Sequence, residues 1–148
     1  NYTPVDQMAA FLGAVESASG LPRTILYSLN PADDQAIDTL CGCFQSSEAV
    51  SKMQHGSAWW FNDHFTGMTN QLTSLANLGY LAGFVGMLTD SRSFASYARF
   101  DFFRRILADT VGGMVARGEY APAHADRLMQ AICYGNAVDF LRLQLQLQ

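Results

Sequence analysis

Apolar positions along the chain alternate between helical spacing and the short continuous runs typical of buried strands. Apolar side chains every three or four residues predict a first helix, with Thr3 as its cap, Pro4 at its first position and Gly20 at its end. Residues 24–29 form a short apolar run that predicts a buried strand. Asn30, followed by a proline, predicts the start of a second helix. The core face of that helix is expected to consist of Ile37, Leu40, Cys41 and Phe44.

The middle of the chain repeats this order twice. Residues 50–57 are a candidate second strand and have the most polar composition of the predicted strands. A helix is predicted over residues 66–78, because its apolar side chains fall on one side and Gly79 follows as a stop. Residues 84–88, with the sequence Phe-Val-Gly-Met-Leu, show the clearest strand pattern.

The remainder of the chain is predicted to be helical. A long helix is expected over residues 93–117, ending at Gly118, and Pro122 begins a last helix. Strands that are joined by helical crossovers must be parallel, so the order of elements predicts an α/β fold with three βα units and flanking helices. A complete (β/α)8 TIM barrel takes about 250 residues, and a lone three-stranded parallel sheet leaves two unpaired edges. We therefore expect residues 1–148 to be the C-terminal part of a single TIM-barrel domain.

Composition narrows the classes of function. Of the 148 residues, 49% are hydrophobic and 15% are charged, as in globular domains. The net charge is −4 and Lys52 is the only lysine, which argues against nucleic acid as a partner. No apolar run approaches the roughly 18 residues of a membrane span, and no secretion signal opens the sequence, so a cytoplasmic protein without a membrane partner is expected. A small anionic substrate is compatible, because one or two arginines can hold a carboxylate.

Candidate chemistry lies where the predicted strands end, since functional side chains of parallel α/β folds gather there. Asp90 directly follows the third predicted strand, and a carboxylate at that place can bind a divalent cation or accept a proton. Arg92 would place a guanidinium beside it, suited to a substrate carboxylate. An aspartate that caps the next helix and pairs with Arg92 fits the same spacing equally well.

Two adjacent tryptophans, Trp59 and Trp60, stand in the loop after the second predicted strand. Adjacent indoles point in different directions, so one or both could line a sugar pocket, while a tryptophan covering the core beneath a loop is equally compatible. His55 and His64 flank this loop, and a lone histidine is more often structural than a ligand.

Several other residues with reactive or charged side chains are expected to have structural positions. The odd number of cysteines indicates free thiols, and Cys41-Gly42-Cys43 fits buried helix thiols better than half of a metal site, since no second ligand pair has suitable spacing. His124 is expected at the surface. The arginines of the long helix are expected on a solvated or inter-subunit face; they are Arg99, Arg104 and Arg105.

The strand-end segments together resemble the uronate (glucuronate) isomerase family of the amidohydrolase superfamily. The matching stretches are TILYSLNP (24–31), GSAWWFND (56–63) and FVGMLTDSRSF (84–94), and the similarity continues to residue 107. The resemblance implies that the three strands are the sixth, seventh and eighth of the barrel. It also implies aldose–ketose isomerisation through an enediol, between D-glucuronate and D-fructuronate and between D-galacturonate and D-tagaturonate.

The resemblance further implies roles for individual residues. Asp90 matches a metal-binding aspartate placed for proton transfer, Arg92 matches a substrate-contacting arginine, and Trp59 and Trp60 match a tryptophan pair that lines the pocket. It implies a divalent metal, zinc, and a homo-oligomer. The family's His-x-His metal pair is missing from this sequence, so the chain alone is expected to be inactive.

Two further interpretations can be weighed against the sequence. The chain could be a catalytically silent module that serves folding or assembly. A hydrolase of the same superfamily would share Asp90 but would not need the tryptophan pair or Arg92, so the presence of both motifs in this sequence argues against that interpretation.

Overall fold

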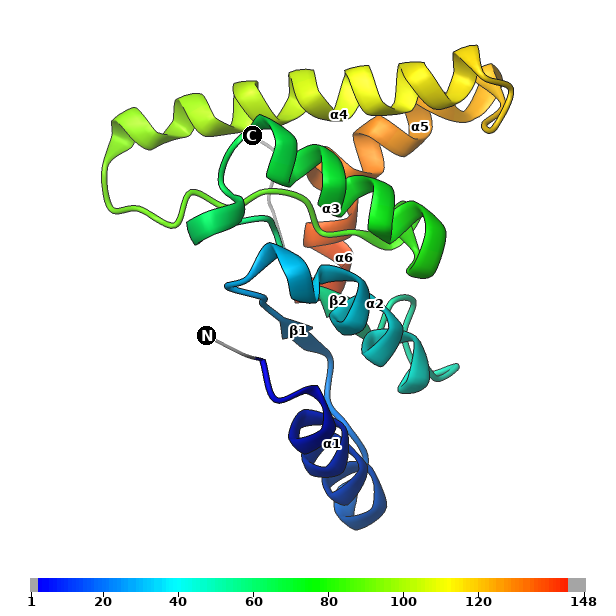
Figure 1. Ribbon diagram of the computed structural model, residues 1–148. Coiled ribbons are helices and arrows are strands. Elements are labelled where there is room, and N and C mark those ends of the chain that lie inside the picture. Colours follow the sequence, from blue (N-terminus) through cyan, green and yellow to red (C-terminus); the bar gives the residue numbers. More distant parts are fainter. Residues whose placement is uncertain (1–2, 144–148) are drawn as a thin grey trace.

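Two short parallel strands, β1 (Thr24–Leu26) and β2 (Met53–His55), lie near the centre of the computed structural model, which describes residues 3–143 (Figure 1). Thr24 is opposite Met53 and Leu26 is opposite His55. The parallel pairing predicted from the alternation of strands and helices is confirmed. Both strands are shorter than the apolar runs that predicted them.

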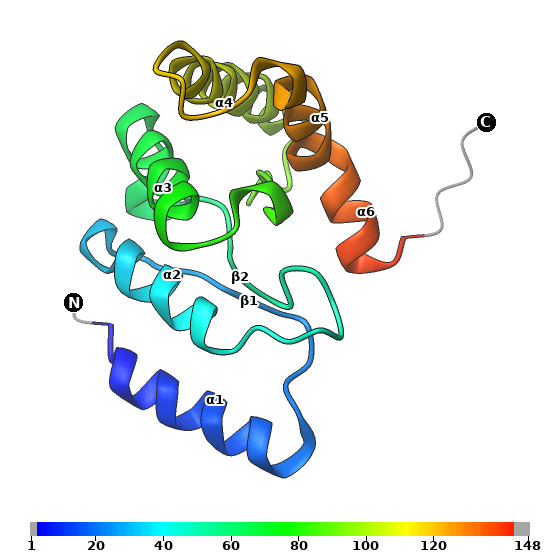
Figure 2. The same ribbon diagram turned by 90° about the vertical axis from the view of Figure 1, so that its right-hand side faces the viewer.

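Four helices lie in a row beside the strands: α1 (Val5–Ser19), α2 (Asp34–Cys43), α3 (Phe65–Leu78) and α4 (Ala98–Ala116) (Figure 2). Each contacts the next in that order. The chain then turns into α5 (Ala125–Gln130), a π-helical turn (Ala131–Gly135) and α6 (Asn136–Leu141). Helix α6 lies on the other side of the strands from this row (Figure 2).

The helix ends follow the capping residues of the sequence in most cases. Asn30 accepts a hydrogen bond from the backbone of Ala32 and opens a 3₁₀ turn that continues into α2. Gly20 has a φ of +77°, which suits its place after α1. Thr3 does not cap α1, because its hydroxyl donates to the carboxylate of Asp33 instead. The predicted long helix begins with a separate 3₁₀ turn, Phe94–Tyr97.

The prediction of a third strand over residues 84–88 is wrong. The backbone N–H of Val85 donates to the side chain of Gln54 (3.1 Å) rather than to a strand, and Asn136 Nδ2 donates to the carbonyl of Phe84 (2.8 Å). Gly86 turns the chain with a φ of +80°. The segment therefore obtains its hydrogen bonds from side chains, and the residues described here contain two strands instead of three.

The core consists of two clusters of buried apolar side chains. One packs α1 and α2 against the sheet and contains Leu12, Leu21, Ile37, Leu40, Cys41 and Met53. The other fills the space between α3, α4 and α5 and includes Met68, Leu72, Phe84, Phe103, Leu107 and Leu128. The apolar run that suggested a third strand thus supplies core through Phe84, which is 2% exposed. Between residues 3 and 143, none of the helices has the length and apolar character needed to cross a membrane.

Candidate functional site

Four aromatic rings form a continuous row beyond the carboxyl ends of β1 and β2. The aromatic row (Tyr27, Trp59, Trp60 and Phe61) has centroid separations of 5.7, 6.1 and 6.3 Å between successive rings. Tyr27 comes directly after β1, and the other three follow β2. Trp59 is half-buried, whereas Trp60 and Phe61 are each 63% exposed. The two indoles therefore do not share one core, as their adjacency in the sequence predicts.

Trp59 carries a hydrogen-bond donor that has no partner. Its indole Nε1 is buried, and no acceptor among residues 3–143 reaches it. A buried donor without a partner costs about 1–3 kcal/mol, so such groups are normally satisfied in a native protein. Trp59 Nε1 is thus a donor that a bound oxygen atom could satisfy.

Asp90 lies at the same end of the strands as this row. Its side chain is exposed and its φ is +47°, a backbone conformation that turns the chain after the extended segment. Burial raises the pKa of the Tyr27 hydroxyl, and the negative charge of Asp90 raises that pKa further. Asp90 and Tyr27, 63 positions apart in the sequence, are therefore close enough to interact electrostatically.

Arg92 is exposed beside Asp90 and forms no ion pair with any residue in the part of the chain that the structure describes. The alternative in which Asp90 caps the next helix and pairs with Arg92 is not observed. Ser93 takes the capping position instead, accepting a hydrogen bond from the backbone of Ala95 (3.3 Å). Both charged side chains of the Asp-Ser-Arg segment are thus left facing solvent.

Arg99 joins the two loops of the site, a role that the sequence does not reveal. From α4 it forms an ion pair with Asp63, after β2, and donates a hydrogen bond to the carbonyl of Thr89. The expectation of a merely solvated or inter-subunit arginine is wrong for this residue, whose side chain is 24% exposed. Arg104 and Arg105 are exposed, which is consistent with the expectation of a solvated face for these two residues.

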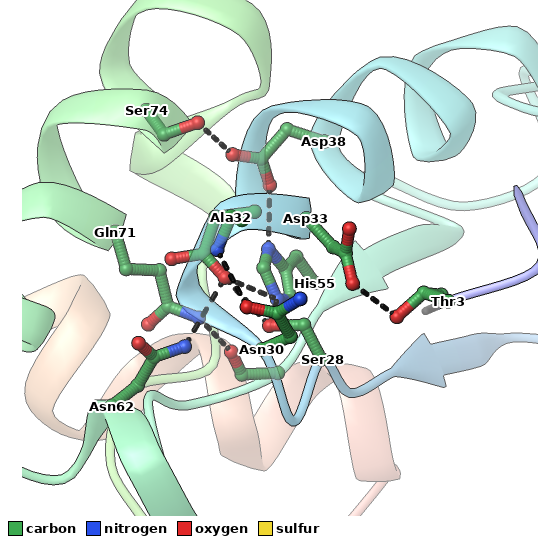
Figure 3. Close-up of polar contacts among 12 residues, drawn as sticks. Thr3, Ser28, Asn30, Ala32, Asp33, Asp38, His55, Asn62, Gln71 and Ser74 are labelled. Carbon is green, nitrogen blue, oxygen red and sulfur yellow. Dashed lines mark hydrogen bonds and ion pairs between the residues drawn. The ribbon is translucent and has the colours of Figure 1, made fainter. Parts of the chain in front are cut away.

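A buried polar network lies between the strands and helices α2 and α3 (Figure 3). At its centre His55, only 1% exposed, has Nδ1 2.8 Å from Asp38 Oδ1 and Nε2 3.1 Å from Ser28 Oγ. We call it the His55 network; its members are Ser28, Asp34, Asp38, His55, Asn62 and Ser74. The sequence offers no signal for it beyond a histidine in a predicted strand, because its members come from five separate segments.

Burial also shifts the pKa of acidic groups in and next to this network. Desolvation raises the pKa of Asp34, and the charge of Asp38 adds to this, while hydrogen bonds from Ser28 and Asn62 and the nearby His55 oppose it. Burial, with Asp38 nearby, raises the pKa of the Cys41 thiol to about 12. Cys41 is therefore a protonated core thiol at neutral pH, as its helical position predicts.

The described residues do not form a complete metal site. No group of three histidine, cysteine or acidic side chains within residues 3–143 is arranged to hold a cation. Cys41 is buried and Cys43 is exposed, so the two thiols do not face a common ligand. His64 Nδ1 accepts from the backbone of Gly67 (3.2 Å) as the cap of α3, and His124 is exposed. Asp90 offers one carboxylate, which by itself fits at most part of a metal site.

Comparison with known proteins gives a single consistent answer. The family model described as glucuronate isomerase matches residues 2–141. A uronate isomerase of Endomicrobium trichonymphae is 55% identical over 147 residues, which are 98% of this chain and 31% of that protein. One of Lachnospira eligens is 55% identical over 142 residues, 94% of this chain and 30% of that protein. The chain thus spans about a third of the length of the curated relatives it matches.

Solved structures agree on the fold. The crystal structure of a uronate isomerase from Thermotoga maritima superposes with a TM-score of 0.80 and 31% identity, over 91% of this chain and 28% of that one. A glucuronate isomerase from Caulobacter crescentus gives a TM-score of 0.79 at 23% identity, over the same shares of the two chains.

Proposed function

We propose, from the premise that this chain belongs to the glucuronate isomerase family, that it supplies part of the active site of an aldose–ketose isomerase acting on hexuronates. The observation that carries the proposal is that the negative charge of Asp90 acts on Tyr27, the first ring of the aromatic row, directly after β1. In parallel α/β folds this end of the sheet is where substrates bind. The relatives that this chain matches are named uronate isomerases, which supports an isomerase activity on uronates.

The residues present suit the chemistry of such an isomerase. Moving a proton between neighbouring carbons of a sugar requires a group that accepts and returns it, and the exposed carboxylate of Asp90 has that capacity. The guanidinium of Arg92, which has no ion pair within residues 3–143, would hold the carboxylate of the uronate. The indole faces of the row would pack on the sugar ring, and Trp59 Nε1 would donate to one of its oxygens.

We further propose that the two strands belong to a (β/α)8 barrel in the complete protein. The backbone N–H of Thr24 donates to Lys52, and the carbonyl of Leu26 accepts from Gly56 (2.7 Å). Since alternate residues of a parallel strand face opposite neighbours, the backbone of Ile25 faces the free edge of β1. A free edge of this kind favours pairing with a further strand. This chain covers 28% of the 31% identical structure, which leaves room for further strands in the complete protein.

We propose that the complete enzyme binds a divalent metal, zinc, and that this chain supplies only part of the metal site. Asp90 would contribute one ligand, and the remaining ligands would come from residues outside this chain. The complete enzyme is proposed to act in the cytoplasm as a homo-oligomer on a small-molecule hexuronate.

The test is an isomerase assay on the full-length protein that contains this sequence, with D-glucuronate and D-galacturonate as substrates and the ketose product measured. We expect turnover of at least one of them, and its loss in Asp90→Asn with the fold retained by circular dichroism. An inactive full-length protein would favour the alternative of a silent folding or assembly module. Unchanged activity in Asp90→Asn would remove Asp90 from the mechanism.

A further inference from the structure

We infer that His55 is a buried imidazolium, protonated on both ring nitrogens and held between Asp34 and Asp38, and that it positions the aromatic row from behind. The protonation state rests on the geometry of the His55 network alone. The kinetic part of the positioning role rests on the proposed function.

The network is almost wholly buried, so its polar atoms depend on one another for hydrogen bonds, and within residues 3–143 Asn62 Oδ1 is its buried side-chain atom without a partner. His55 is 1% exposed, Asp38 is 0% exposed and Ser28 is 3% exposed. Buried polar atoms are nearly always hydrogen-bonded in native proteins, and buried charges persist only where they are paired. The hydrogen atoms of the network can therefore be assigned by counting donors and acceptors.

The count begins at Ser28, whose hydroxyl has one hydrogen. Ser28 Oγ lies 2.6 Å from Asp34 Oδ1, the shorter of its two contacts in the network, and donates there. Its contact with His55 Nε2 (3.1 Å) must then be one that it accepts, so Nε2 carries a proton. Asp34 Oδ1 also accepts from Asn62 Nδ2 (3.2 Å), and two donors on one oxygen favour an ionised carboxylate.

The other side of the ring gives the second proton. Asp38 Oδ2 accepts from the hydroxyl of Ser74, and Asp38 Oδ1 lies 2.8 Å from His55 Nδ1. An ionised Asp38 can only accept at both oxygens, so Nδ1 must donate. His55 then donates from both nitrogens, which is possible only for the imidazolium form.

The charges also balance better with the imidazolium present. Asp34 and Asp38 are both on α2 and both buried, and the positive ring between them compensates two like charges. Asp38 is on one side of the ring at 2.8 Å and Asp34 is on the other at 3.9 Å. Without the ring charge, two carboxylates would share a water-free interior, which is strongly unfavourable.

This arrangement fixes the backbone directly behind the aromatic row. Ser28 follows Tyr27, and His55 precedes Gly56, over which the Tyr27 ring lies. A Cβ at Gly56 would be 2.3 Å from Tyr27 Cε1, so ring and backbone are in close contact. Gln71 also donates to the carbonyl of Gly56 (2.7 Å). Tyr27 in turn contacts Trp59, so the network is connected to the row through both strand ends.

The protonation state can be tested on the unaltered protein, labelled with ¹⁵N in histidine only. Comparison with His55→Gln identifies the ring resonances of His55, and His64→Gln is the control that should leave them in place. We expect both His55 nitrogens to resonate as protonated nitrogens at pH 7. An unprotonated Nε2 at pH 7 would mean that Ser28 donates to the ring and Asp34 holds the proton, and an unprotonated Nδ1 would mean that Asp38 holds it. Either result would overturn the inference.

The positioning role needs a second measurement. His55→Gln keeps hydrogen-bonding groups but no charge, and we expect loss of the near-ultraviolet circular dichroism of Trp59 and Trp60 with the far-ultraviolet spectrum retained. His64→Gln, which alters a helix cap outside the network, should leave that signal unchanged. A native aromatic signal in folded His55→Gln would overturn the positioning role. If His55→Gln does not fold, Ser28→Ala makes the same test, because it removes the partner of Nε2.

In the active enzyme, His55→Gln should raise the KM for the hexuronate more than it lowers kcat. The aromatic row would bind the sugar but take no part in the chemical step. If the complete protein does not turn over hexuronates, the proposed function is refuted. The resonance and circular dichroism measurements would still test the protonation state of His55 and its positioning role. The two ideas can therefore fail separately.

Discussion

The guanidinium of Arg99 forms an ion pair with the carboxylate of Asp63, and the same side chain donates to the carbonyl of Thr89. One residue of α4 thus joins the loop that carries the tryptophans to the segment that carries Asp90. Thr89 and Asp63 are 10 and 36 positions away from Arg99 in the sequence, so only the folded chain brings the three residues together.

Replacing Arg99 by alanine should loosen this junction. We expect a loss of about 1–2 kcal/mol in the free energy of unfolding, because a carbonyl and a partly buried carboxylate lose their partner. Urea denaturation measures the loss. Arg105→Ala is the matched control, since its ion pair with Asp101 is exposed within one helix and should be worth less than about 0.5 kcal/mol. Equal effects in the two variants would show that Arg99 has no special structural weight.

Arg92 is expected to matter for binding and turnover rather than for folding. In the complete enzyme, Arg92→Ala should reduce kcat/KM by about 2–4 kcal/mol in transition-state terms, because a charge-assisted contact to the uronate carboxylate is lost. Thermal unfolding should be unchanged, since Arg92 has no ion pair within residues 3–143. Arg104→Ala, which removes an exposed arginine of α4, is the control. Unaltered kinetics in Arg92→Ala would refute its contact with the substrate.

Tyr27 should report directly on the charge of Asp90. Because burial and Asp90 both raise the pKa of Tyr27, Asp90→Asn should lower that pKa towards the ordinary value of 10.0. The titration is followed by the resonances of ring-labelled tyrosine at alkaline pH. Asp101→Asn, on the exposed face of α4, should leave the Tyr27 titration unchanged.

The same shift has a consequence for stability. A hydroxyl whose pKa is higher in the folded than in the unfolded chain favours folding by its neutral form. Its contribution is therefore intact below the ordinary pKa of 10.0 and declines as the pH rises above that value. Asp90→Asn should reduce this alkaline decline. A Tyr27 titration that does not respond to Asp90→Asn would contradict the proximity of the two residues.

Gly86 and Gly112 should respond to alanine in opposite directions. Gly86 has a φ of +80°, and a Cβ there would be 2.3 Å from the carbonyl oxygen of Ile132, so Gly86→Ala should cost more than about 1 kcal/mol. Gly112 lies within α4 with no atom within 4 Å of an added Cβ, so Gly112→Ala should stabilise by about 0.5–1 kcal/mol. Chemical denaturation compares them, and a neutral Gly86→Ala would contradict the turn after Val85.

Local patterns determined much of this protein. Helix periodicity and capping residues predicted the positions of α1 to α4 closely, because these depend on side chains three or four positions apart. The alternation of strands and helices predicted parallel pairing, and β1 and β2 are parallel. Trp59 follows β2 as predicted, whereas the strand expected before Asp90 does not form. The family motifs in the same segments agree with the family to which the chain belongs.

Tertiary structure alone decided the rest. Residues 84–88 have the composition of a strand, yet Gln54 and Asn136, 31 and 52 positions away from their partners, take up their backbone hydrogen bonds. His55 appears in the sequence as a lone polar residue, and only folding surrounds it with two carboxylates. Periodicity reports which face of a segment is apolar. It carries no information on which distant side chain will satisfy a buried polar atom, and in this chain such pairings shape both the sheet and the site.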